Sequence, residues 1–262
     1  WFGPLLILLG VYLLLPLCGS TAVSKPWRHA VLAGLLCGLA AGLKPTAVVY
    51  PPALALALLV ALGARVAAWR VCLMFCGGAL AGFTLAYGWW GWQLYSLTGN
   101  PVFPLFNQLF HSSWVPLVSG RDAQFLPRNL GQWLFYPLYW LRKNHDLVTE
   151  GNFADGRYAL EMLAVVVLCA TSWLTRRHPR PGASLVRLLV VFVVAAYMLW
   201  LVLFSILRYT VPLGALSGLL SMLALQAWPI SQRADGVRHR WPTWVMAVSI
   251  LLLAGFSRSP GW

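Results

Sequence analysis

Two basic residues lie at breaks between apolar runs. Lys44 is followed by Pro45 and separates two such runs, while Arg208 ends another run immediately before Tyr209. Phosphate suits both side chains, because lysine offers a compact charge and the planar guanidinium of arginine donates hydrogen bonds in pairs. Snorkelling towards a membrane surface, or an ion pair between Arg208 and Glu161, is the alternative. The residue types thus predict a site for an anionic group such as a lipid phosphate.

A second candidate is the pair Arg121 and Asp122, in a polar stretch of the chain. A carboxylate there can act as a general base or bind a divalent metal, and a salt-bridged loop pair is the alternative. His111 and His145 have no partners at ligand spacing, so no metal site is predicted from them. Walker, HExxH and GxSxG motifs are absent, which argues against nucleotide use and a serine nucleophile.

The composition indicates that a lipid bilayer surrounds the protein. The chain of 262 residues is 60% hydrophobic and 10% charged, and it contains 15 tryptophans. A soluble domain of this size could not bury so much apolar surface. The net charge of +13 comes from basic residues beside apolar runs, which is the pattern of membrane topology signals and not of nucleic-acid binding. We therefore expect an all-α, polytopic transmembrane bundle that forms a single domain over residues 1–262.

Eight apolar runs are candidate membrane helices. The second and third are short, since fourteen helical residues rise only about 21 Å against a hydrocarbon core of about 30 Å. The Lys44–Pro45 break is therefore expected below the membrane surface, where a charge is tolerated only beside a cavity or a partner. The eight runs cover residues 4–23, 30–43, 47–63, 71–92, 159–175, 186–207, 210–228 and 243–257.

Basic residues predict the orientation. They dominate the loops near Arg65, Arg176 and Arg238, which places those loops in the cytoplasm by the positive-inside rule. The outer face then contains residues 93–158, Lys44 and Arg208. Lys44 and Arg208 are therefore positive charges on the side of the membrane where the positive-inside rule disfavours them. We expect them to point into one outer-facing cavity, close enough to share a phosphate.

The long segment 93–158 is expected to be an outer loop that contains an interfacial helix. Residues 130–141 are too short to span a bilayer and too aromatic for water, so Trp133 and Trp140 are expected at headgroup depth. Glycines at four-residue spacing predict close helix packing elsewhere. They are Gly34, Gly38 and Gly42, then Gly78 and Gly82, and finally Gly214 and Gly218.

Four short runs resemble membrane glycosyltransferases of the GT-C class, such as protein O-mannosyltransferases and aminoarabinose transferases. Residues 38–56, GLAAGLKPTAVVYPPALAL, are similar to a GLaxGLxxTKxT region of that class. Residues 98–110, TGNPVFPLFNQLF, look like the GNPxFPFxN outer-loop segment of a bacterial branch. Arg121, Asp122, Phe125 and Pro127 match a following charged segment, from which Gln124 and Leu126 depart. The run from Arg208 to Pro212 resembles an RYxxP element.

The resemblance implies a bacterial inner-membrane, multi-pass enzyme of the cell envelope. Such an enzyme moves a sugar from a polyprenyl-phosphate donor to a glycan, lipid or protein acceptor, with no cofactor beyond a possible divalent metal. It implies Asp122 as a catalytic residue, and Lys44, Arg208, Tyr209, Arg121 and Asn107 as substrate-binding residues. In the class, an essential acid follows the first span. The chain starts at Trp1 within an apolar run, so it is expected to be a C-terminal fragment that lacks that acid.

Two other functions remain open at this point. Broken helices and intramembrane charge also suit a secondary transporter, although the spans show no inverted repeat. A non-catalytic membrane assembly subunit is the second alternative. The sugar, the acceptor, the oligomeric state and the organism are not encoded in any motif of the sequence.

Overall fold

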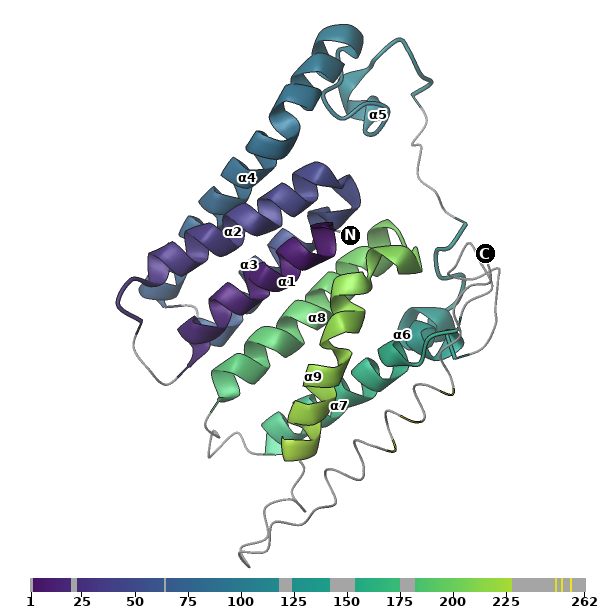
Figure 1. The fold of residues 1–262 in the computed structure, drawn as a ribbon. Helices are drawn as coiled ribbons and strands as arrows, with labels where there is room; N and C mark the ends of the chain where they lie inside the picture. Colours follow the sequence, from purple (N-terminus) through teal and green to yellow (C-terminus); the bar gives the residue numbers. More distant parts are fainter. Residues whose placement is uncertain are drawn as a thin grey trace, which may run out of the picture.

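The computed structural model describes residues 2–19, 23–63, 65–117, 124–141, 154–174 and 182–227, and three single positions, 248, 251 and 255. All regular structure in these ranges is helical, which confirms the all-α prediction (Figure 1). The α-helices are α1 (Phe2–Leu14), α2 (Pro26–Leu43), α3 (Tyr50–Leu62), α4 (Val66–Thr98), α5 (Asn107–Phe110), α6 (Leu130–Tyr139), α7 (Arg157–Leu174), α8 (Ala183–Leu203) and α9 (Val211–Ala227), and the 3-10 turns are η1 (Leu15–Cys18), η2 (Pro45–Val49) and η3 (Leu207–Tyr209).

Four helical segments among the described residues are long and apolar enough to cross a membrane. This agrees with a helical membrane protein, but the expected count of about eight spans is not confirmed. Seven of the eight apolar runs do form helices, and the eighth, 243–257, lies almost entirely outside the described residues. The four segments are Pro45–Leu62, Val66–Thr98, Arg157–Leu174 and Ala183–Leu203.

The glycine seam holds α2 against α4. We give this name to Gly34 and Gly38 of α2 with Gly78 and Gly82 of α4. A Cβ atom added at Gly38 would overlap the carbonyl oxygen of Ala79, and a Cβ atom at any of the other three would likewise overlap a backbone oxygen of the facing helix. The two backbones therefore touch, as small residues allow in membrane proteins.

Not all of the regularly spaced glycines have the packing role that was predicted for them. Around Gly214, an added Cβ atom would lie 3.0 Å from the hydroxyl oxygen of Tyr158, which is a tight contact. Around Gly218, no atom of the described residues lies within 4 Å of such a Cβ atom, so the predicted packing is not observed there. Four-residue spacing identifies a smooth face, but it does not show whether a neighbour covers that face.

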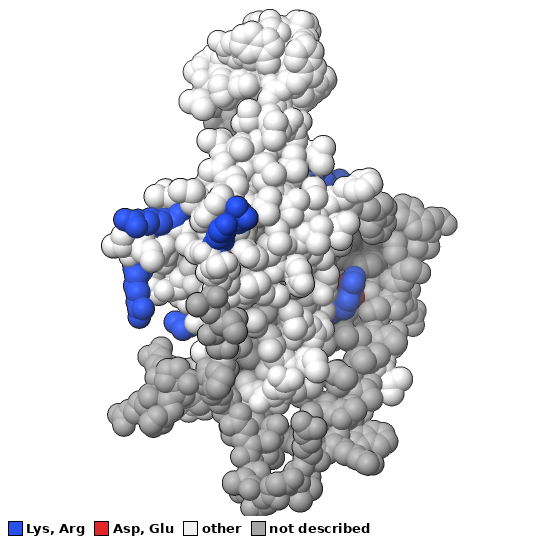
Figure 2. All heavy atoms as spheres, turned by 60° about the vertical axis from the view of Figure 1, so that its left-hand side comes forward, with Lys and Arg blue, Asp and Glu red and all other residues white. Residues whose placement is uncertain are grey.

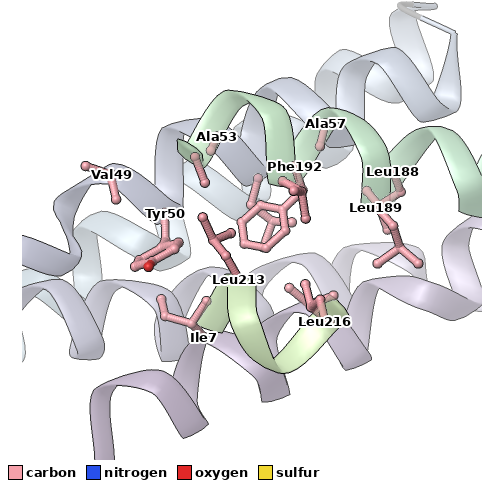
Figure 3. Close-up of a cluster of buried hydrophobic side chains, with 14 of the residues drawn as sticks. Ile7, Val49, Tyr50, Ala53, Ala57, Leu188, Leu189, Phe192, Leu213 and Leu216 are labelled. Atoms are coloured by element: carbon pink, nitrogen blue, oxygen red, sulfur yellow. The ribbon is translucent and has the colours of Figure 1, made fainter. Parts of the chain in front are cut away.

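Buried apolar side chains from four helices form a cluster next to the Lys44 break. Figure 3 shows Ile7 of α1, Tyr50 of α3, Phe192 of α8 and Leu213 of α9 turned towards one another. The rings of Tyr50 and Phe192 lie 6.2 Å apart, centre to centre. Since these side chains are almost fully buried, they fix the ends of α3 and α9 relative to each other.

Helix α4 is longer than the predicted span of residues 71–92. It ends at Thr98, where Gly99 takes a left-handed conformation with φ of 73°. Such a glycine commonly ends a helix, because it accepts positive φ without steric cost. Residues 93–98 are therefore helical, and the segment expected to be an outer loop begins with the last turns of α4.

Helix α6 forms where the interfacial helix was predicted. The side chain of Asn129 accepts a hydrogen bond from the backbone N–H of Gln132 and so caps its first turn. Trp133 is 38% exposed, whereas Trp140 is 3% exposed and packs edge-on against Tyr158 and Trp200. The Trp140 ring is therefore enclosed by protein, while the expected headgroup depth of the two rings stays a prediction.

Candidate functional site

The break at Lys44 follows from the proline after it. A residue before proline avoids the α region, because the proline Cδ clashes with its backbone N–H and Cβ. Lys44 accordingly has φ of −142° and ψ of 103°, and α2 ends there. The chain resumes as η2 and continues directly into α3. Lys44 thus lies at a fixed corner between two apolar helical segments, as the sequence predicted.

The break before Arg208 has a different cause. Helix α8 ends at Leu203, and Ser205 takes a positive φ of 55°. The indole N–H of Trp200 donates to the carbonyl of Ile206 at 2.8 Å, and the hydroxyl of Ser205 donates to that of Leu201 at 2.7 Å. These bonds occupy two carbonyl groups at the break, so the turn that carries Arg208 and Tyr209 is fixed from inside the bundle.

The two breaks meet at Tyr209. The Lys44 ammonium lies 4.8 Å from the centre of the Tyr209 ring, and the Arg208 guanidinium carbon lies 5.2 Å from it. The guanidinium also donates to the Tyr209 hydroxyl oxygen at 3.3 Å. The hydroxyl of Tyr50 donates to the Tyr209 carbonyl, although 159 positions separate them. Residues far apart in the sequence are therefore brought to one place.

Lys44 and Arg208 both line one small hollow. The N-terminal turns of α1 contribute Gly3, Pro4 and Ile7 to its wall, and Tyr209 contributes its ring. Its volume of about 30 Å³ is enough for one or two atoms the size of a water oxygen. Lys44 and Arg208 are exposed at its mouth, so an anion could place one oxygen in the hollow and its remaining oxygens against the two cations.

The electrostatics of the site favour an anion. Lys44 and Arg208 are like charges that contact the same Tyr209 ring. Two like charges held this close disfavour each other until an opposite charge joins them. The π-face of Tyr209 offsets part of this repulsion through cation–π contacts. A phosphate bound to both cations would offset more, because it accepts charge-assisted hydrogen bonds from each.

The other predicted site residues do not join this cluster. Asn107 is 2% exposed, and its amide bonds the backbone of Ser112 and Val115 at 2.8 to 3.0 Å, so it braces the loop after α5. It does not line the hollow. Arg121 and Asp122 lie outside the described residues. Within the described ranges, no three His, Cys, Asp or Glu side chains lie together as metal ligands.

Two buried residues near the site were missed at the sequence level. Tyr50 anchors the Tyr209 carbonyl, and Glu161 of α7 is only 5% exposed. One oxygen of Glu161 has no hydrogen-bond partner among the described residues. From the sequence, Glu161 was considered as an ion-pair partner of Arg208. Its position one turn inside an apolar run was the available signal, since an acid within a span is a functional candidate by default.

The comparisons with known proteins add no relative. No protein-family model, no curated protein and no solved structure matches this chain. The resemblance to the GT-C class therefore rests on the four short sequence runs alone.

Proposed function

We propose that this chain belongs to a membrane glycosyltransferase of the GT-C type, which moves a sugar from a polyprenyl-phosphate donor to an acceptor at the outer, periplasmic face of a bacterial inner membrane. One observation carries the proposal. Lys44 and Arg208, both predicted to bind phosphate, line one hollow and contact the same tyrosine ring. Two cations at breaks between apolar helices suit a phosphate that arrives on a lipid.

In the proposed reaction, an oxygen of the acceptor attacks the anomeric carbon of the sugar. The bond between that carbon and the phosphate oxygen breaks, and the electron pair leaves with the phosphate. Lys44 and Arg208 stabilise the negative charge that develops on the departing lipid phosphate. The acceptor proton passes to a carboxylate acting as general base, a role that we assign to Asp122. Arg121 and Tyr209 are proposed to contribute to donor binding, whereas we assign no donor contact to Asn107, because its buried amide is bonded to neighbouring backbone.

The decisive experiment measures sugar transfer in proteoliposomes containing the protein expressed from its complete coding sequence. Lys44→Ala and Arg208→Ala should each lower transfer from a polyprenyl-phosphate sugar by tenfold or more, since a hydrogen bond to a charged group contributes about 1.5 to 3 kcal/mol. Arg208→Lys keeps the charge and loses the paired donors, so it should retain only part of the activity.

Arg28 provides the matched control. Its guanidinium carbon lies 5.3 Å from the centre of the Trp27 ring, a contact like that of Arg208 with Tyr209, but Arg28 does not line the hollow. Arg28→Lys should leave transfer unchanged. Wild-type transfer by both Lys44→Ala and Arg208→Ala, at equal protein levels, would remove the proposed phosphate site.

The same experiment separates the alternative functions. Two helix breaks that meet near charged residues also suit a secondary transporter. Movement of a labelled lipid phosphate across the proteoliposome membrane, with no sugar transferred, would favour that function. Neither transfer nor movement in the full-length protein would favour a non-catalytic assembly subunit.

A further inference from the structure

A long stretch of the chain has no charged side chain. From Val71 to Gly120, the sequence contains no Lys, Arg, Asp or Glu. Its described part forms most of α4 and the aromatic tip, the name that we give to residues 95–117. The tip stands beyond the rest of the bundle in Figure 1, and Figure 2 shows no charged side chain on it from that side. Large apolar side chains that are more than half exposed cover the tip: Tyr95, Leu97, Phe106, Leu109 and Trp114.

The glycine seam fixes the height of the tip relative to the candidate site. Gly34 faces Phe75 and Ala79, and Gly42 faces Ala86, so α2 and α4 run side by side in the same direction. Lys44 follows Gly42 by two residues and is therefore level with α4 near Gly88. Ten further residues bring α4 to Thr98, which is about 15 Å at 1.5 Å per residue.

These heights allow two placements in a membrane. If the Lys44 site were at the membrane surface, the end of α4 at Thr98 would stand about 15 Å out in water, and the exposed rings of the tip would be in water as well. If the tip lies at the surface, its Trp and Tyr rings are at the headgroup layer that such rings prefer, and the site is sunk below it. The absence of charge and the continuity with the lipid-facing side of α4 favour the second placement.

We propose that the aromatic tip is a membrane-docking surface that lies in the headgroup layer on the Lys44 side, with the Lys44–Arg208 hollow beneath it, about 15 Å below the level of Thr98. The length of α4 agrees with this. Its 33 residues span about 50 Å, whereas a bilayer measures about 30 Å across its hydrocarbon and 40 to 45 Å with its headgroups. An anion would then reach the hollow from within the leaflet, as the headgroup of a lipid.

Spin-label depth measurements test the proposal in proteoliposomes of phosphatidylcholine and phosphatidylglycerol. Single cysteines are placed at Leu109 in the tip, Leu43 beside the site and Leu80 in the middle of α4, in a background without the five native cysteines. All three leucines are more than half exposed. Accessibility to oxygen and to a water-soluble nickel complex should place Leu109 at the headgroups, Leu43 deeper and Leu80 deeper still. Leu97→Cys provides a second label in the tip, and this label should lie roughly 15 Å above Leu43.

Three outcomes would overturn the proposal. Labels at Leu109 and Leu97 that are as accessible to the nickel complex as free label in buffer would place the tip in water. Low accessibility to both reagents would place it against protein, either a second copy or another partner. Equal depths at Leu43 and Leu109 would remove the sunken site. None of these measurements involves a sugar donor, so failure of the glycosyltransferase proposal would not affect them.

Discussion

The glycine seam and the Lys44–Arg208 site differ in what holds them. In the seam, two helices contact each other through backbone atoms, and the absence of side chains makes the contact possible. In the site, two helix breaks from distant parts of the chain meet through one ring, one hydrogen bond and two cations. The seam therefore depends on shape, which a single methyl group can destroy. The site depends on several weaker contacts, and each can be removed without unfolding the bundle.

The largest effect is expected in the seam. Gly38→Ala places a methyl group onto the carbonyl oxygen of Ala79, so α2 and α4 must move apart. We expect a loss of about 3 kcal/mol in stability, at the upper end of overpacking effects. Thermal unfolding in detergent, followed by size-exclusion chromatography, measures it. Gly77→Ala is the matched control on α4, because a Cβ atom there meets no atom within 4 Å. Equal melting temperatures for the two variants would contradict the seam.

A smaller effect is expected where the site is anchored. Tyr50→Phe removes the hydroxyl that donates to the Tyr209 carbonyl and leaves the buried ring against Phe192. A lost hydrogen bond of this kind costs about 1 kcal/mol. Binding of a polyprenyl-phosphate sugar donor, measured by calorimetry in nanodiscs, should weaken by about fivefold, while the melting temperature falls by a few degrees. Unchanged binding would show that this hydrogen bond does not position Tyr209.

The smallest effects concern the Tyr209 side chain. Tyr209→Phe keeps the ring near both cations and loses only an exposed hydrogen bond of 3.3 Å, so donor binding should be almost unchanged. Tyr209→Leu also removes the cation–π contacts, each contributing about 0.5 to 1 kcal/mol at exposed sites. We therefore expect binding to weaken severalfold in Tyr209→Leu alone. Equal affinities in the two variants would remove the role of the π-face.

The sequence predicted the parts of the site that depend on local rules. Lys44 was identified because Pro45 forces a break, and Arg208 because it interrupts a topology pattern. Because both residues were assigned to the same face of the membrane, their proximity was expected. The contacts of both cations with the Tyr209 ring and the hydrogen bond from Tyr50 were not predicted. Those contacts depend on how α3, α8 and α9 pack, which no spacing within the chain encodes.

Other features escaped sequence reasoning for physical reasons. Residues 93–98 contain polar side chains that suggested a loop, but no residue stops the helix before Gly99. Trp133 and Trp140 are the same residue type in one short segment, so the sequence does not distinguish them. Tertiary packing buries the Trp140 ring and leaves the Trp133 ring partly exposed. The amide of Asn107 is occupied by neighbouring backbone, although its motif implied a substrate contact.

The clamp between α2 and α4 has a consequence for bilayer thickness. Because the seam prevents α2 from sliding along α4, the distance between the tip and the hollow along α4 is fixed. A thinner membrane must then be met by tilting that helix, at a cost of fractions of a kcal/mol per ångström of mismatch. Tilting shortens the distance between the tip and the hollow along the membrane normal, and the hollow then lies closer to the water. The affinity of the hollow for a lipid phosphate should thus vary with acyl-chain length, even when the headgroup stays the same.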